Sequence, residues 1–195
     1  MDCMEGMKQF PDKFFELAIV DPPYGINAPK FNNGSGASKD KGNKYGTAVR
    51  LRATQRLNHG CGKLGGRVLN KSNCEWDIAT PGPEYFTELM RVSKNQIIWG
   101  GNYFDLPPTR CVIAWDKKQP WKNFSQFELA WTSFDKPAAI FRMGNTRGGK
   151  IHPTQKPVEL YEFLVANYVK SPTEKILDTH VGSASSLIAF HRAGL

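Results

Sequence analysis

The sequence lacks any apolar run that approaches the length of a membrane span, and residues 1–10 lack the apolar core of a signal peptide. We therefore expect a cytoplasmic protein without a membrane partner. Cysteine is scarce as well. Cys3, Cys61, Cys74 and Cys111 are scattered and form no CxxC pair, so we expect neither a disulfide framework nor a bound metal. His59 lies near two of these cysteines, and a metal site there is the less favoured alternative to a loop histidine with surface thiols.

Internal repeats are also missing, and nothing in the pattern divides the chain into two units. Its 195 residues, 40% hydrophobic and 12% aromatic, have the size and composition of a globular protein with a substantial core. We expect a single domain over residues 1–195.

The net charge of +8 comes from one part of the sequence. Residues 30–71 contain ten Lys or Arg and one acid, whereas the rest of the chain has sixteen basic and seventeen acidic residues. The surrounding region 27–73 is rich in Gly, Asn, Ser and Lys, which is typical of a long loop-rich insertion. Such a segment suits contact with phosphates, and a solvated basic loop is the equally weighted alternative.

The stretch FELAIVDPPYG at residues 15–25 is the most informative part of the sequence. Its apolar run at 17–20 predicts a strand buried on both faces, as in a parallel sheet. Two prolines then take the chain out of the sheet, because proline cannot donate ladder hydrogen bonds. We expect a carboxylate, backbone carbonyls and an aromatic ring at the carboxyl end of a strand, where open α/β sheets bind ligands.

These groups suit the chemistry of an exocyclic amine on a nucleobase. Ionised Asp21 and the Pro22 carbonyl are acceptors, and each can take one N–H of the amine. Negative potential on both hydrogens favours the positive charge that develops on nitrogen during its attack. Tyr24 offers a face on which an extruded base can stack. The alternative is a Pro-Pro turn without a chemical role.

Helical and strand patterns alternate along the chain and predict an α/β fold. Segments 127–131 and 138–141 look like a hairpin around a turn near Asp135–Pro137, so we expect a mostly parallel sheet with an antiparallel edge hairpin. The expected helices lie within 1–13 and at 83–92, 157–169 and 185–192, and the expected strands at 17–20, 96–99, 111–115, 127–131, 138–141 and 174–178.

Two further motifs lie in the region 151–195. HPTQKP at 152–157 precedes a helix, and LDTHVGSASS at 177–186 joins a strand to the next helix. In the second motif small residues allow the backbone to approach a ligand, and the helix N-terminus offers unpaired N–H groups. This loop alone is a weak signal, because Gly and Ser are common in turns between strands and helices.

DPPYG, HPTQKP and LDTHVGSASS, in this order, closely resemble the β-type amino-methylating DNA methyltransferases. The resemblance covers most of the chain and implies a Rossmann-like S-adenosylmethionine-dependent methyltransferase fold. In this family the catalytic half precedes the cofactor-binding half, and the Asp-Pro-Pro-Tyr form usually accompanies methylation of adenine N6.

The resemblance also implies the site residues. His152 and Lys156 would lie near the methionine end of the cofactor, where a lysine can pair with its carboxylate. Transfer would be direct and in line, without a covalent enzyme intermediate, and would depend on positioning. The implied residues are, as catalytic, Asp21, Pro22, Pro23 and Tyr24, and, as cofactor-binding, Asp21, Pro22, His152, Lys156, Asp178, Gly182, Ser183 and Ser185.

Three departures from the family pattern matter. His180 stands where many relatives have an aromatic residue, and Ala184 replaces the second glycine of a Gly-x-Gly loop, which strains the loop if it requires positive φ. The sequence ends at Leu195, before the strand that would follow in the family. We therefore expect a truncated enzyme that lacks the last strands of the cofactor half, with the strand ending at Asp178 left as a sheet edge and a reduced affinity for the cofactor.

Double-stranded DNA is the expected partner. Residues 143–150 are almost too few to form the family's usual recognition insert. The basic segment is therefore our candidate for contacting DNA, through Lys44, Arg50, Arg52 and Arg56. A homodimer and a companion restriction endonuclease are further partners that we consider.

The resemblance thus implies a site-specific DNA methyltransferase that acts on adenine N6 by base flipping. One alternative is an amino methyltransferase for cytosine N4, RNA or a protein glutamine, although Asp at position 21 argues against most of these. The other is a catalytically impaired, DNA-binding remnant that no longer holds S-adenosylmethionine.

Replacement of Arg50, Arg52 and Arg56 by Ala tests the role of the basic segment. We expect weaker DNA binding and a shallower dependence of the binding constant on salt, because counterion release scales with the number of phosphates neutralised. Binding titrations over a range of salt concentrations measure both. An unchanged salt slope would eliminate this segment as the main phosphate contact.

Overall fold

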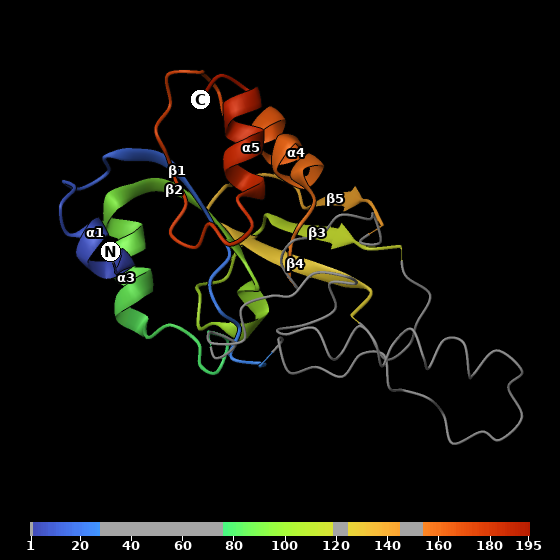
Figure 1. Ribbon diagram of the computed structural model, residues 1–195, viewed down its shortest axis with the longest axis horizontal. Coiled ribbons are helices and arrows are strands. Elements are labelled where there is room, and N and C mark those ends of the chain that lie inside the picture. Colours follow the sequence, from blue (N-terminus) through green and yellow to red (C-terminus); the bar gives the residue numbers. More distant parts are fainter. Residues whose placement is uncertain (1, 28–75, 119–124, 145–153) are drawn as a thin grey trace, which may run out of the picture.

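A computed structural model describes residues 2–27, 76–118, 125–144 and 154–195. The whole of the basic segment, residues 30–71, lies outside this part of the chain, including the predicted DNA contacts Lys44, Arg50, Arg52 and Arg56. His152 lies outside it as well. The described residues form a mixed α/β structure, in which a six-stranded sheet lies between two layers of helices (Figure 1).

The described elements agree with the predicted ones to within a few residues. None of the helices among them has the length and apolar character of a membrane span. The helices are α1 (Cys3–Met7), α3 (Pro83–Val92), α4 (Val158–Tyr168), α5 (Ser185–Arg192) and the short 3-10 helix η3 (Gly101–Tyr103), and the strands are β1 (Phe15–Val20), β2 (Ser93–Trp99), β3 (Val112–Asp116), β4 (Phe127–Thr132), β5 (Ala139–Arg142) and β6 (Ile176–Leu177).

The strand order is β5-β3-β4-β2-β1-β6. β1 pairs in parallel with β2 on one side and with β6 on the other. β4 is antiparallel to both of its neighbours, β2 and β3, and β5 is parallel to β3. Five strands therefore run in one direction and β4 runs against them, which confirms the predicted α/β class and the mostly parallel sheet.

The predicted hairpin between segments 127–131 and 138–141 is wrong. β4 lies inside the sheet with β2 and β3 on its two sides, so it has no free edge for the following strand. β5 instead joins the outer edge of β3, with Ile113 opposite Ala139 and Asp116 opposite Arg142. The antiparallel hairpin consists of β3 and β4. It does not lie at the edge of the sheet, because β5 pairs with the outer side of β3.

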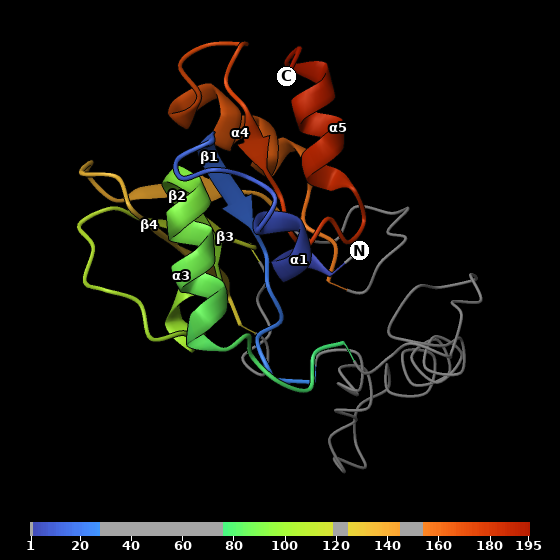
Figure 2. The same ribbon diagram turned by 90° about the vertical axis from the view of Figure 1, so that its left-hand side faces the viewer.

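The sheet separates two apolar cores. Leu17 and Ile19 of β1 pack on the side of α4 and α5, whereas Ala18 and Val20 pack on the side of α1 and α3. This alternation is the two-residue period of a strand covered on both faces. Figure 2 shows α1 and α3 on one side of the strands and α4 and α5 on the other.

Leu164 of α4 tests the core on the second face, because its side chain is fully buried between the helix and the sheet. Leu164→Ala should lower the free energy of unfolding by about 2–5 kcal/mol, through lost burial and a residual cavity. Leu187→Ala is the matched control on α5, where the side chain is 47% exposed, and should change stability by no more than about 0.5 kcal/mol. Urea unfolding measures both, and equal losses would contradict this assignment of the core.

Candidate functional site

The directions of the strands bring several polar side chains together at one end of the sheet. Parallel strands present their carboxyl ends on the same side, so the residues that follow β1, β2 and β6 meet there. These include Asp21, Gly100 and Asp178. β4 runs the other way, so its first residues, among them Glu128, reach the same end.

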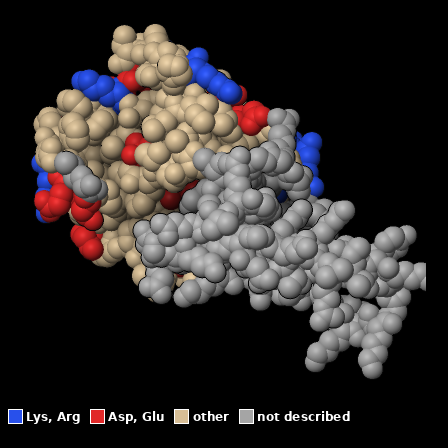
Figure 3. Space-filling model, in the orientation of Figure 1, with Lys and Arg blue, Asp and Glu red and all other residues tan. Residues whose placement is uncertain are grey.

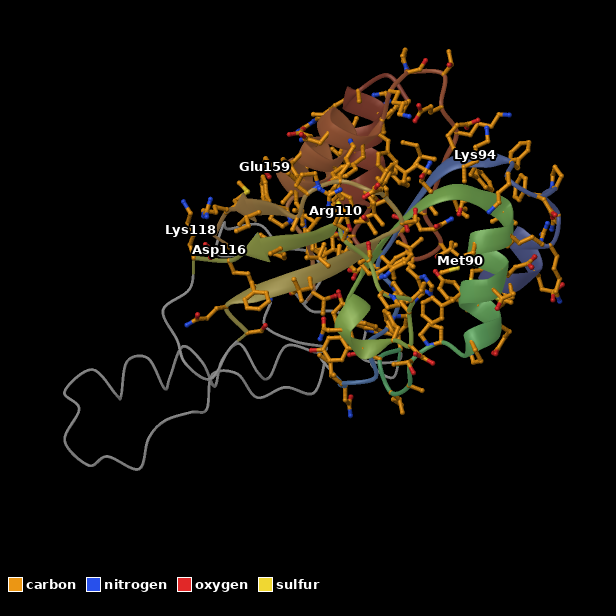
Figure 4. The ribbon with its side chains drawn as sticks, turned by 180° about the vertical axis from the view of Figure 1, so that it is seen from behind. Met90, Lys94, Arg110, Asp116, Lys118 and Glu159 are labelled. Atoms are coloured by element: carbon orange, nitrogen blue, oxygen red, sulfur yellow. The ribbon has the colours of Figure 1, made fainter. Side chains whose placement is uncertain are left out.

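The two ends of the sheet can be followed in Figure 4. Asp116 and Lys118 lie at the carboxyl end of β3, where the Lys118 amide donates to Asp116 Oδ1 at 2.9 Å. Lys94, at the amino end of the parallel strand β2, lies at the opposite side of the molecule. The candidate site belongs to the end marked by Asp116.

The DPPYG loop is held by a buried carboxylate from a distant part of the sequence. Asp77 is 2% exposed, and its Oδ1 accepts the backbone N–H of Tyr24 at 2.7 Å and that of Gly25 at 2.9 Å. Gly25 has a φ of 69°, and its backbone lies against that of residues 79 and 80. Pro22 is buried in the same loop. The loop therefore has a fixed shape at the end of β1.

Both oxygens of Asp21 are hydrogen-bonded. The Tyr24 hydroxyl donates to Oδ1 at 2.6 Å, and the Lys156 ammonium donates to Oδ2 at 2.6 Å. Lys156 also donates to the Tyr24 hydroxyl at 3.0 Å, which closes a three-membered ring of contacts. The first residue of one predicted motif, the tyrosine of the same motif and the lysine of HPTQKP thus lie in direct contact.

A second carboxylate shares the lysine. Lys156 Nζ lies 3.1 Å from Glu128 Oε2, and Lys117 forms an ion pair with the other oxygen of Glu128. Burial raises the pKa of Glu128, but the charges of Lys156 and Lys117 outweigh it and bring the pKa down to about 2. Burial lowers the pKa of Lys156, and the carboxylates of Asp21 and Glu128 more than offset it, so this pKa lies above 10.5. Glu128 and Lys156 are therefore both charged at neutral pH.

The ring of Tyr24 is enclosed by aromatic and glycine neighbours. Tyr103 of η3 stacks on it at a centroid distance of 5.0 Å and an interplanar angle of 12°. A Cβ on Gly100, which has a φ of 73°, would overlap the Tyr24 ring. Burial, followed by the charge of Asp21, raises the pKa of Tyr24 well above 10, so the hydroxyl keeps its proton. Tyr103 itself is 43% exposed, so the stack has one ring that faces solvent.

The predicted cofactor loop lies beside this cluster because β6 pairs directly with β1. Asp178 organises the loop: its Oδ1 accepts the His180 backbone N–H at 2.9 Å, and its Oδ2 accepts the Ser186 hydroxyl at 2.5 Å. Burial raises the pKa of Asp178, although these two hydrogen bonds oppose the shift. The Ser183 and Ser185 hydroxyls are 3.0 Å apart at the start of α5.

Helix α3 also contacts this loop. The Tyr85 hydroxyl lies 2.6 Å from Thr179 Oγ1, and Thr179 Oγ1 lies 2.9 Å from His180 Nδ1. Burial lowers the pKa of His180, although the charge of Asp21 works in the opposite direction. His180 is therefore largely neutral at neutral pH, and its position links the loop to the helix layer on the other side of the sheet.

The structure brings most of the predicted residues to this carboxyl end of the sheet. Asp21, Tyr24 and Lys156 touch, Pro22 and Pro23 belong to the same loop, and the residues 178–185 follow the adjacent strand. Among residues 2–27, 76–118, 125–144 and 154–195, no group of three His, Cys, Asp or Glu side chains is arranged to hold a metal.

Sequence reasoning missed four residues that shape the site: Asp77, Tyr103, Lys117 and Glu128. For Glu128 a signal was present, because a carboxylate in the otherwise apolar strand FELAWT requires a buried partner. Asp77 gave no such signal, since it lies more than fifty residues from the loop that it holds.

On the face shown in Figure 3, acidic side chains gather on the side of α1, and basic side chains are scattered around the rim. Within the described part of this face there is no basic stripe. This matches the sequence, in which the excess positive charge belongs to residues 30–71.

No family model matches the chain, and no curated protein matches it. Among solved structures, the chain is similar to a crystal structure, as a selenomethionine derivative, of a candidate DNA modification methylase from Thermus thermophilus. The TM-score is 0.44 and the sequence identity 16%, over 99% of this chain and 83% of that chain. A likeness at this level carries no argument about activity, so the functional inference depends on the geometry of the site.

Two backbone positions in the loop after β6 give opposite predictions. Ala184 has a φ of 60°, so the loop does require the left-handed conformation at this position, and Gly182 has a φ of 55°. Ala184→Gly should raise the free energy of unfolding by about 1 kcal/mol, because an L side chain is strained there. Gly182→Ala should lower it by a similar amount, mainly through backbone strain, since among the described residues beyond its chain neighbours the added Cβ would meet only the His180 carbonyl oxygen within 4 Å, at 3.8 Å.

Ala193→Gly is the matched control, because Ala193 has a φ of −85° and gains nothing from glycine. It should be neutral or destabilising in the same urea titrations. Stabilisation by both Ala→Gly changes would show that the effect does not come from the left-handed conformation.

Proposed function

We propose that this chain is a DNA methyltransferase that transfers a methyl group from S-adenosylmethionine to N6 of adenine, in double-stranded DNA, by base flipping. The observation that carries the proposal is the placement of Asp21 next to the loop 178–185. β1 and β6 are neighbouring parallel strands, with Ala18 opposite Leu177, so the amine-binding motif and the predicted cofactor loop leave the sheet side by side.

The residues present fit the cofactor. Gly182 leaves space for a close approach within the described structure, where a Cβ would meet only the His180 carbonyl oxygen within 4 Å, its chain neighbours aside. The Ser183 and Ser185 hydroxyls and the start of α5 add polar groups in the same place. We assign Asp178, Gly182, Ser183 and Ser185, with Asp21 and Pro22, to cofactor binding. When bound, S-adenosylmethionine supplies a methyl group whose bond to sulfur is weakened by the positive charge of the sulfonium.

The chain's own residues act on the amine. Asp21 and the Pro22 carbonyl hold its two N–H groups, which would leave the nitrogen lone pair free to face a bound cofactor. With the cofactor bound, the nitrogen would form its bond to the methyl carbon as that carbon leaves the sulfonium, and the electron pair of the broken bond would stay on sulfur. The proton that the amine then loses passes by way of Asp21 to water. Each Asp21 oxygen has two lone pairs, so the bonds to Tyr24 and Lys156 leave room for the amine.

The contacts of Lys156 favour a role different from the one that its motif implies. Its ammonium has three protons, and the described structure uses them on Asp21, Glu128 and Tyr24. The role expected for it, pairing with the cofactor carboxylate, would require one of these partners to move. We therefore assign its main role to fixing Asp21.

The basic segment is attached directly at this site. The Asn27 backbone N–H donates to the Asp77 carbonyl at 2.7 Å, so the residues just before and just after the segment 28–75 are adjacent. The same Asp77 holds Tyr24 and Gly25 through its side chain. A segment with eight excess positive charges that starts and ends at the DPPYG loop is well placed to hold DNA there.

Asp21→Asn tests the proposal. The amide removes the negative charge that favours the developing positive charge on the amine, so we expect methyl transfer to fall by at least about 100-fold. Transfer of labelled methyl groups to DNA measures the rate, and identification of the modified base tests adenine against cytosine. Asp135→Asn is the matched control, since Asp135 forms an exposed ion pair with Arg110 in the described structure, and it should keep full activity.

Calorimetry with S-adenosylmethionine completes the test. If the unaltered protein binds DNA but neither binds the cofactor nor transfers methyl groups, it is a DNA-binding remnant and the proposed activity is wrong. If Asp21→Asn retains full activity, Asp21 does not hold the amine.

A further inference from the structure

Glu128 is a charged residue near the start of an otherwise apolar strand. β4 pairs with β3 on one side, with Trp115 opposite Glu128, and with β2 on the other. The Glu128 side chain is only 22% exposed. A carboxylate in such a place is costly unless it is paired, so its partners indicate why it is there.

Glu128 belongs to a row of alternating charges that ends at the proposed catalytic carboxylate. The order is Lys117, Glu128, Lys156 and Asp21, and neighbouring members form ion pairs, with 3.1 Å between Glu128 and Lys156 and 2.6 Å between Lys156 and Asp21. The antiparallel direction of β4 is what brings Glu128 to the end of the sheet where Asp21 lies.

The Lys156 ammonium is held in one position by three acceptors. Besides the two carboxylates it donates to the Tyr24 hydroxyl at 3.0 Å, and its side chain is 2% exposed. Three protons and three acceptors leave no donor free. Without Glu128, one proton would lose its partner and the ammonium could shift, taking Asp21 with it.

The charge of Glu128 has a second effect. A buried ammonium with Asp21 as its only counterion would cancel the negative potential that Asp21 presents to an amine. A second carboxylate on the same ammonium restores part of that potential, because electrostatic interactions are strong where water is excluded. Lys117 lies on the far side of Glu128 and therefore weakens this effect without removing it.

We infer that Glu128 is a positioning residue for the proposed methyl transfer, acting through Lys156 to hold Asp21 in place and to keep its negative potential available to the amine. This inference rests on the proposed function for its effect on rate. Its structural part, the control of Lys156 by Glu128, can be tested without any reaction.

Other titratable groups also face this ammonium. Asp21 and Tyr24 come from the loop after β1, Glu128 from β4, and Asp178 from the loop after β6. Two other groups lie further out. Lys117, just after β3, interacts with Glu128, and Tyr161 of α4 interacts with Asp21. Among these, Glu128 and Asp21 are the two carboxylates in direct contact with Lys156, so removing the charge of Glu128 should have a clear effect on its titration.

The experiment compares the unaltered protein with Glu128→Gln and Glu128→Asp. Titration of Lys156, followed by NMR at its Cε in the free protein, should show a lower pKa in Glu128→Gln, because burial then acts against one carboxylate instead of two. The maximal rate of methyl transfer should fall by at least about tenfold in Glu128→Gln with KM values little changed. The pH above which activity is lost should also be lower in Glu128→Gln, because Lys156 then loses its proton at a lower pH.

Glu128→Asp keeps the charge on a shorter side chain, so it should recover part of the lost rate and of the Lys156 shift. It also provides a folded variant if Glu128→Gln is unstable. Glu162→Gln is the matched control, because Glu162 forms an exposed ion pair with Arg192 between α4 and α5, and it should leave the titration of Lys156 and the rate unchanged.

The outcomes separate the two claims. If Lys156 titrates at the same pH in the unaltered protein and in Glu128→Gln, the inference is wrong, whether or not methyl transfer occurs. If the titration shifts but the unaltered protein transfers no methyl group, the control of Lys156 stands and the proposed function fails. A lower rate in Glu128→Gln without any change in the pH above which activity is lost would indicate a general structural defect and would also overturn the inference.

Discussion

The ion pair between Lys156 and Asp21 joins two segments that lie far apart in the sequence. Asp21 directly follows the first strand, and Lys156 lies just before α4, 135 positions later. Because both side chains lie at the carboxyl end of the sheet, their contact fixes the start of α4 relative to the DPPYG loop. The geometry at this end depends on that contact.

Buried ion pairs are weak evidence for stability, since the loss of hydration can equal or exceed the attraction. A protein gains little stability from placing two carboxylates and two lysines here, compared with an apolar cluster of the same size. The arrangement is easier to understand as a way of holding one carboxylate in a defined position and charge state. Tyr24 contributes to the same end, because its hydroxyl donates to Asp21 while its ring is held by Tyr103.

Much of this structure could be predicted from the sequence, and the failures have a common cause. Local patterns were sufficient for the strand before Asp21 and for the helices, and the glycine missing at position 184 pointed to a residue that the structure places in the left-handed conformation. The partner of β5 could not be predicted, because any strand with a free edge satisfies the same pattern, and β4 had none to offer. The partners of Lys156 were missed for a similar reason, since a sequence shows that a lysine is present but not which carboxylates the fold will bring to it.

The contact between Asn27 and Asp77 has an evolutionary consequence. The Asn27 N–H and the Asp77 carbonyl are hydrogen-bonded, so the fold already holds the two residues that border this part of the sequence close together, and each added residue between them would cost little loop-closure entropy. Under the proposed function, variation between Asn27 and Asp77 would give selection a way to change how DNA is bound while Asp21 and Tyr24 keep their positions.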